Sequence, residues 1–105
     1  MDKILYSIHR EDMDNELWLV VNSKKYWEEN RCQSDRTPQE VFDFLDGHNL
    51  PFGEVMDGVI EIGNKDELKP ASKETEAKLS EILNDSDMFE LNDEFSNFCK
   101  ECCTP

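Results

Sequence analysis

The chain has 105 residues, of which 37% are hydrophobic and 34% are charged. This length fits one domain, and six Phe, two Trp and two Tyr supply enough large apolar surface for a core, which excludes wholesale disorder. The 25 acidic residues outnumber the 11 Lys and Arg, so the formal net charge is -14. Such an excess argues against direct binding to nucleic acid or to an anionic membrane, because both require a cationic surface.

Two strands are predicted first along the chain. Residues 3–9 place Ile4, Tyr6 and Ile8 on one face of a strand. Residues 16–22 are apolar on both faces, which is typical of a central strand. The polar turn between them predicts an antiparallel hairpin. Residues 23–33 are compatible with two structures, because they can continue the sheet through Tyr26 and Trp27 or form a short helix.

The clearest local signal is the tetrapeptide Thr37-Pro38-Gln39-Glu40. It has the form of a capping box with Pro at the first helical position, and Gly47 is a typical helix stop. The pattern predicts a helix over 38–46 whose apolar side faces the core and whose acidic side faces solvent.

The second half of the chain predicts one more strand segment and two helices. Residues 54–62 are typical of a strand that folds back through a type I′ turn at Asp57-Gly58. Helices are expected over 73–84 and 87–101. Residues 1–105 should therefore form a single acidic α+β domain, with a small antiparallel sheet of three or four strands and about three helices packed on one face.

Negative charge is concentrated in the later part of the chain. Residues 1–36 carry 8 acidic and 6 basic side chains, whereas residues 37–105 carry 17 acidic and 5 basic ones. The stretches 37–64 and 79–99 contain no Lys or Arg, although surface helices usually intersperse both signs. We therefore predict two ridges of unpaired carboxylates that bind a basic partner. The first comprises Glu40, Asp43 and Asp46 on the first helix, and the second comprises Glu90, Asp93, Glu94 and Glu101 on the last helix. The alternative is that both are solvated faces of an acidic protein.

Two aromatic side chains are further candidates for partner binding. Tyr26 and Trp27 lie in the polar sequence KKYWEEN and are expected to be partly exposed. Exposed aromatic side chains are enriched as anchors of protein interfaces. The alternative is that they form a second small core against the sheet.

The candidate metal ligands are the four cysteines, Cys32, Cys99, Cys102 and Cys103. The one C-x-x-C pair would need Cys32, His9 or His48 to complete a zinc site, so a small metal-binding regulatory module is the alternative function. We expect instead that Cys99 and Cys102 are buried thiols on the apolar side of the last helix. No metal ligand and no cofactor are therefore assigned.

The sequence contains no Gly-rich phosphate loop, nucleophile elbow or zinc-protease motif, so no catalytic residue is assigned and an enzyme is not expected. No signal peptide or membrane span is recognised, and a cytoplasmic location is expected. In size and charge the chain is similar to phage-encoded anti-restriction and anti-CRISPR inhibitors and to bacterial immunity proteins, although no motif links it to one family. These features predict a non-enzymatic acidic inhibitor, a nucleic-acid mimic that binds the basic surface of a nuclease or another nucleic-acid-binding protein.

Overall fold

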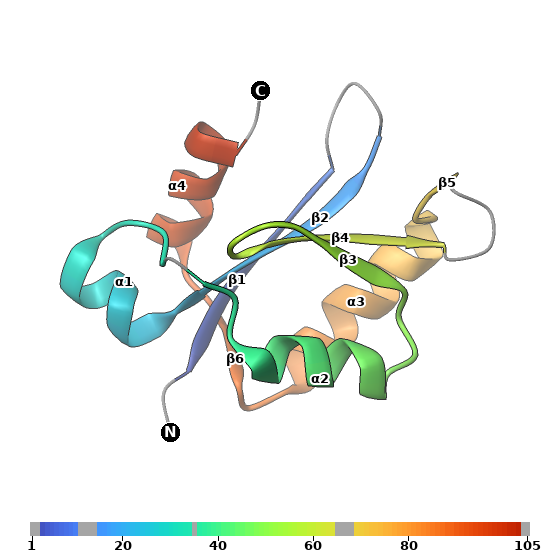
Figure 1. Cartoon of the computed structure of the whole chain (residues 1–105), viewed down its shortest axis with the longest axis horizontal. Helices are drawn as coiled ribbons and strands as arrows, with labels where there is room; N and C mark the ends of the chain where they lie inside the picture. Colours follow the sequence, from blue (N-terminus) through green and yellow to red (C-terminus); the bar gives the residue numbers. More distant parts are fainter. Residues whose placement is uncertain (1–2, 11–14, 35, 65–68, 104–105) are drawn as a thin grey trace.

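The computed structural model describes residues 3–10, 15–34, 36–64 and 69–103 (Figure 1). Its strands are β1 (Ile4–Arg10), β2 (Leu17–Ser23), β3 (Phe52–Met56), β4 (Val59–Asn64), β5 (Lys69–Pro70) and β6 (Phe89–Leu91), and its helices are α1 (Lys24–Asn30), α2 (Gln39–Gly47), α3 (Lys73–Asp85) and α4 (Asp93–Cys103). The predicted α+β class is confirmed.

The sheet has the strand order β3-β4-β2-β1-β6, and β5 pairs with β4 outside this path. β2 is a central strand, as its two apolar faces predict. The pairs β1–β2, β2–β4 and β3–β4 are antiparallel, whereas β6 runs parallel to β1. The sheet is therefore mixed and larger than the antiparallel sheet of three or four strands that we expected.

Strand β6 lies within residues 87–101, for which the sequence predicts one continuous helix. Phe89 is buried in the core, where its ring meets the Tyr6 ring edge-on at 6.1 Å between centroids. Helix α4 begins only after Asn92, whose side-chain oxygen accepts a hydrogen bond from the Phe95 N–H at 2.9 Å. The start of the predicted helix is wrong because pairing with β1 and burial of Phe89 favour an extended segment there.

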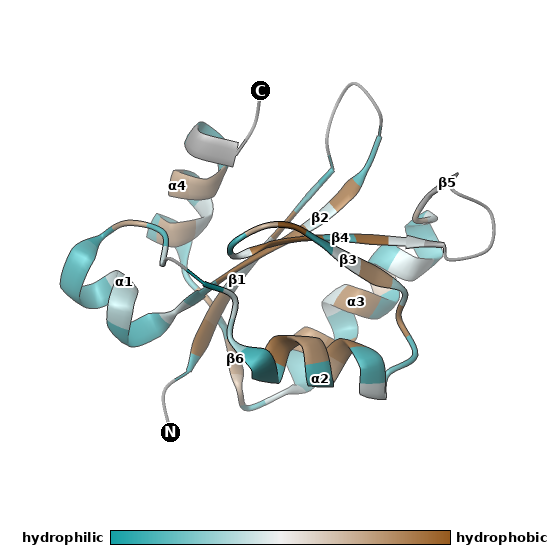
Figure 2. Ribbon diagram, in the orientation of Figure 1, coloured by the Kyte–Doolittle hydropathy of each residue, from teal (hydrophilic) through white to brown (hydrophobic). Residues whose placement is uncertain are grey.

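Helices cover both faces of the sheet, not one face as predicted. Leu19 of β2 packs in one core cluster with Leu45 of α2 and Leu79 of α3. The next residue along β2, Val20, packs in a second cluster with Phe95 of α4. Successive side chains of a strand point to opposite faces, so the apolar sheet lies between two helical layers (Figure 2).

Helix α1 settles the choice between strand and helix that the sequence left open. The Ser23 hydroxyl caps it by accepting from the Tyr26 N–H at 3.3 Å. Trp27 is only 3% exposed, so the expectation that it is partly exposed is wrong. Its ring contacts Phe95 and Phe98 of α4 at 5.4 and 5.2 Å between centroids. For Trp27, the alternative of a second small core against the sheet is correct.

The fully buried Asn22 fixes the chain between α1 and α2. Its amide nitrogen donates to the Cys32 carbonyl at 3.2 Å, and its amide oxygen accepts from the Ser34 N–H at 2.6 Å. Because both hydrogen bonds are made to backbone, they hold this connection against the end of β2 and so help to set where α2 begins.

Thr37 does not act as the predicted cap of α2. The N-cap is Pro38, which makes no side-chain capping bond. The buried Thr37 hydroxyl instead accepts from the Gly58 N–H at 2.7 Å and donates to the Glu54 carboxylate at 2.6 Å. It therefore joins the start of α2 to the β3–β4 hairpin, a long-range contact that outweighs local capping.

Replacing Thr37 with valine tests this contact, because valine keeps the shape of the side chain and removes the hydroxyl. We expect Thr37→Val to lower the free energy of unfolding by about 1–3 kcal/mol, since the Gly58 N–H loses its partner in a buried site. Urea denaturation gives the value. Thr75→Val in α3 is the matched control, because the Thr75 hydroxyl bonds only to the exposed Ser72 hydroxyl, at 3.2 Å, among the described residues, and it should change stability by less than about 0.5 kcal/mol. Equal values for the two variants would contradict a structural role for the Thr37 hydroxyl.

Candidate functional site

Helix α2 presents the first predicted ridge to solvent. Glu40, Asp43 and Asp46 are all exposed, while Val41 and Leu45 on the opposite side of the helix are fully buried. Within the described part of the chain, the three carboxylates take part in no ion pair. The buried side anchors the helix, so these charges stand at fixed positions on its surface. We call Glu40, Asp43 and Asp46 the α2 ridge.

Helix α3 extends the acidic surface beside α2. It packs in the same core cluster, and its Lys78 ammonium group donates to the His48 carbonyl, just after α2, at 3.3 Å. Glu74, Glu81 and Asp85 of α3 are exposed. Glu76 of α3 is paired with Arg10 at 2.7 Å, and the other six carboxylates of the two helices still outnumber the two lysines of this layer. The outer surface of the α2–α3 layer is strongly negative.

The second predicted ridge comprises Glu90, Asp93, Glu94 and Glu101 and is only partly unpaired. Glu90 lies in β6 and forms an ion pair with Lys24 at 2.9 Å. The hydrogen bond from Lys24 lowers the pKa of the Glu90 carboxyl. Glu94 forms an ion pair with Arg31 of the α1–α2 connection. The expectation of unpaired carboxylates is wrong for these two residues, whereas Asp93 and Glu101 are exposed on α4.

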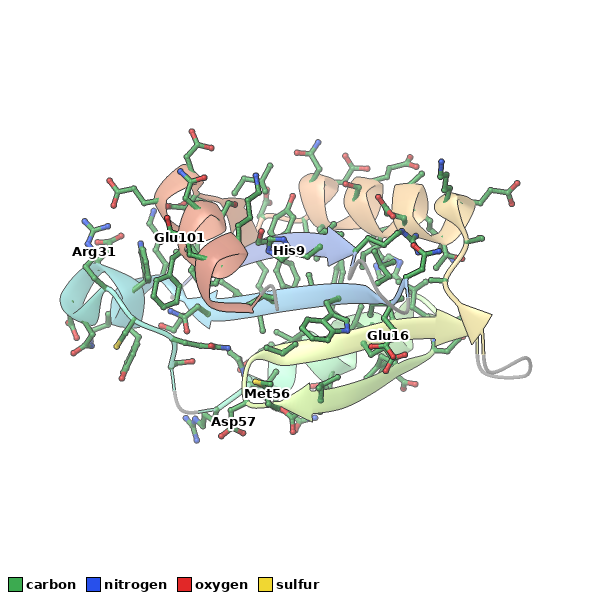
Figure 3. All side chains as sticks on the ribbon, turned by 90° about the horizontal axis from the view of Figure 1, so that it is seen from above. His9, Glu16, Arg31, Met56, Asp57 and Glu101 are labelled. Carbon is green, nitrogen blue, oxygen red and sulfur yellow. The ribbon has the colours of Figure 1, made fainter. Side chains whose placement is uncertain are left out.

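The two ridges do not form one surface. α2 packs on one face of the sheet and α4 on the other. Figure 3 looks onto the α4 face and shows Glu101 on the far side of α4 from the strands. A flat partner therefore contacts one acidic surface or the other, and the more uniformly negative one is the α2–α3 layer.

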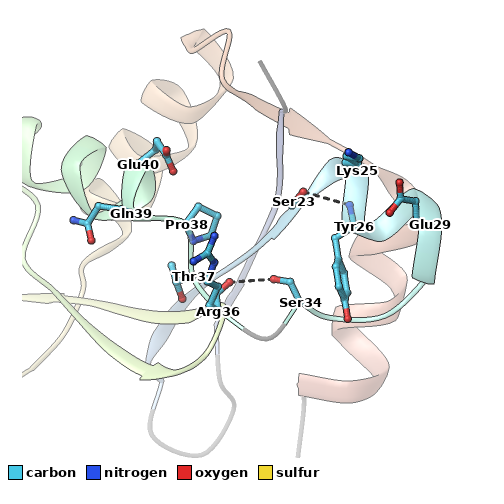
Figure 4. A pocket seen from close by; sticks show the side chains of 10 residues that line it. All are labelled: Ser23, Lys25, Tyr26, Glu29, Ser34, Arg36, Thr37, Pro38, Gln39 and Glu40. Carbon is cyan, nitrogen blue, oxygen red and sulfur yellow. Dashed lines mark hydrogen bonds between the residues drawn. The ribbon is translucent and has the colours of Figure 1, made fainter.

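A pocket of about 670 Å³ lies between α1 and the start of α2 (Figure 4). Tyr26 and Glu29 line it from α1, and Arg36 and Glu40 line it from the opposite side. The structure thus brings together Tyr26 and Glu40, two of the predicted binding residues. Lys25 and Arg36 balance the two carboxylates in the lining, so the pocket continues the α2 ridge without sharing its uniform charge.

A row of side chains that sequence reasoning missed crosses the α4 face of the sheet. His9 of β1, Trp18 of β2, Glu61 of β4 and Gly53 of β3 lie opposite one another in adjacent strands. We call these four residues the Trp18 row. The sequence feature that could have pointed to this row is Glu61, the one charged residue in the apolar sequence VIEI of β4. Its neighbours in space could be found only from the strand register.

The groups around Trp18 interact with one another. The indole N–H of Trp18 donates to a Glu16 carboxylate oxygen at 3.1 Å. Burial, with a further contribution from Glu16, raises the pKa of the Glu61 carboxyl. At the other end of the row, burial and the nearby Lys100 charge lower the pKa of His9. Together with the adjacent Glu16, the row thus has two carboxylates near Trp18 and, at its β1 end, an imidazole near a cation.

The described cysteines do not share one environment. Cys99 is a free thiol, 1% exposed, so its predicted burial is confirmed, whereas Cys32 is exposed. The side chains of Cys102 and Cys103 lie outside the described residues. Among the side chains that are described, no group of three or more His, Cys, Asp or Glu residues is placed to hold a metal ion.

Comparison with models of known protein families gave no match, and comparisons with curated proteins and with solved structures gave none either. None of the helices in the described ranges is long and apolar enough to cross a membrane. The α2 ridge and the Trp18 row are two surfaces of the described residues on which charged side chains gather.

Proposed function

We propose that the protein is a non-enzymatic inhibitor that docks the α2 ridge onto the basic, nucleic-acid-binding surface of another protein. The observation that carries this proposal is the exposure of three carboxylates on a helix that is anchored by the fully buried Val41 and Leu45. Fixed charges lose little conformational entropy on binding, so they attract a basic surface more effectively than charges on a mobile segment.

The geometry of the ridge supports mimicry of a phosphate backbone. Glu40, Asp43 and Asp46 follow one another at intervals of three residues, which corresponds to a rise of about 4.5 Å along a helix axis. Phosphates along one strand of DNA advance by about 3.4 Å per nucleotide. The two axial spacings differ by about 1 Å, which the long side chains of Lys and Arg in a basic groove can span, so such a groove can contact either array of charges.

The net charge of -14 favours the same partner class through longer-range forces. It repels nucleic acid and anionic lipid and attracts basic proteins, and it accelerates their association at low ionic strength. A nuclease toxin neutralised by an immunity protein and a defence nuclease blocked by a phage inhibitor are two settings in which these interactions operate.

The experiment that tests this function uses tagged protein to capture partners from cells that naturally contain it. Bound proteins are eluted in parallel with high salt and with excess duplex DNA. We expect the same nucleic-acid-binding protein in both eluates, and we expect stoichiometric addition of the acidic protein to block its binding or cleavage of nucleic acid. A partner that resists both eluents, or that binds nucleic acid equally well in the complex, would contradict the proposal.

A further inference from the structure

We infer that the Trp18 row, together with Glu16 and Met56, is a second docking surface, which binds an arginine side chain from an extended basic segment of a partner protein. This inference goes beyond the proposed function, because the surface lies on the α4 face of the sheet, opposite the α2 ridge.

The surface is open on one side. Figure 3 shows α4 over the β1 side of this face, while no described helix lies in front of β3 and β4. A Cβ atom added to Gly53, at the outer end of the row, would meet nothing within 4 Å. Met56 is 54% exposed and lies opposite the buried Val59 on the same face. This part of the sheet is thus accessible from the β3 edge, across Gly53 and Glu61, as far as Trp18.

The chemistry of this surface selects a cation. Trp18 is partly exposed, and its indole N–H already donates to Glu16. A ligand can therefore interact with the face of the ring, whose π-system attracts cations. Glu16 and Glu61 place two negative charges beside the ring, close enough for Glu16 to raise the Glu61 pKa. Within the described residues neither carboxylate forms an ion pair. A guest cation would relieve their mutual repulsion.

The row also sets the direction from which a cation enters. α4 covers the β1 end of the row (Figure 3), and the charge of its Lys100 adds to burial in lowering the His9 pKa, so this end is both covered and repulsive to positive charge. The β4 end carries Glu61 and opens over Gly53. A cationic side chain therefore approaches across β3 and stops at Trp18, where attraction is greatest.

Arginine fits this environment better than lysine. Its planar guanidinium group can stack on an aromatic ring while it donates two parallel hydrogen bonds to a carboxylate, whereas an ammonium group acts as a point charge. A second copy of this chain is disfavoured as the occupant, because each copy carries a net charge of -14.

The test is a titration of ¹⁵N-labelled protein with the peptide acetyl-Gly-Arg-Gly-Arg-Gly-amide, followed by NMR. The matching peptide with citrulline in place of arginine keeps the shape and removes the charge. We expect the Trp18 indole signal to shift with the arginine peptide, while the signal of the buried Trp27 indole stays in place. An unmoved Trp18 signal, or equal binding of the citrulline peptide, would overturn the inference.

Two matched variants separate this surface from general attraction by the acidic protein. Glu61→Gln and Glu40→Gln each remove one negative charge, but on opposite faces of the sheet. Glu61→Gln should weaken binding of the arginine peptide by about threefold to tenfold, and Glu40→Gln by less than about twofold. Equal effects would mean that the peptide binds through net charge alone and would overturn the inference.

The fold of the Glu61→Gln variant is checked by its thermal unfolding. The pKa of Glu61 is raised in the folded protein, so wild-type stability decreases as pH rises through that folded pKa. The variant lacks this loss of stability, so at pH 7 its unfolding temperature should be no lower than that of wild type. Weaker peptide binding then reports on the site itself. If the wild-type protein does not bind the arginine peptide but its capture of a partner is still reversed by DNA, the inference is overturned and the proposed function stands. If it binds the peptide but captures no DNA-sensitive partner, the proposed function alone is overturned.

Discussion

Replacing Gly58 with alanine is expected to lower the free energy of unfolding by about 2–4 kcal/mol, the largest effect on stability that we predict. Gly58 has a φ of +81°, a conformation that costs an L-residue about 1–2 kcal/mol. An added Cβ would also lie 3.0 Å from the Val21 carbonyl oxygen and 2.8 Å from the Gln33 amide nitrogen. The Gln33 side chain can move away, but the backbone of β2 cannot.

Gly53→Ala provides the matched control for this prediction. A Cβ at Gly53 meets nothing within 4 Å, and the residue lies in β3 of the same hairpin. This variant should change stability by less than about 1 kcal/mol. Urea denaturation of both variants gives the comparison. Similar small losses for the two would show that the backbone at Gly58 relaxes without cost.

The hairpin tip matters to the proposed function because it holds the start of α2. The Gly58 N–H donates to Thr37 at 2.7 Å, and its carbonyl accepts from the Val21 N–H at 2.9 Å. The Gln33 amide also donates to the Asp57 carbonyl at 2.9 Å. Because only Gly58 of the two central turn residues has a positive φ, the predicted type I′ turn is wrong, although the predicted hairpin at this position is confirmed.

Much of the fold could be predicted because its elements carry strong local patterns. The apolar residues of β2 predicted its central place, and the helical spacing of Val41 and Leu45 predicted the buried side of α2. β6 could not be predicted in this way, because Phe89, Glu90 and Leu91 also fit a helical pattern. Its strand conformation depends on pairing with β1, more than 80 residues earlier in the chain.

The same distinction between local patterns and long-range contacts applies to the candidate sites. Exposure of the α2 ridge follows from helical periodicity alone, so the sequence was sufficient. The ion pairs of Glu90 with Lys24 and of Glu94 with Arg31 join distant parts of the chain and could not be foreseen. The Trp18 row required the register of four strands, which no local pattern contains.

Reversing two charges of the α2 ridge should produce the largest functional effect. We expect Asp43→Lys combined with Asp46→Lys to weaken binding to the captured partner by about tenfold or more at low salt, mainly through slower association. The control combines Asp93→Lys with Glu101→Lys on α4. All four residues are exposed, and both double variants change the net charge by the same amount from -14. Long-range attraction therefore falls equally, and any difference in affinity reports on local docking.

The helix dipole should make the α2 double variant the more stable of the two. Asp46 lies near the C-terminus of α2, where a lysine is favourable, whereas Asp93 lies in the first turn of α4, where a lysine is unfavourable. The α2 variant should thus be at least as stable as the control, so weaker binding by it cannot be attributed to unfolding. The difference in affinity should shrink as salt rises, because exposed charges are screened over about 8 Å at physiological ionic strength. Equal losses of affinity in the two double variants would mean that the α2 ridge is only one part of a generally acidic surface. Unchanged affinity, with binding abolished by Tyr26→Ala, would instead identify an aromatic anchor at the pocket beside α1 as the docking element.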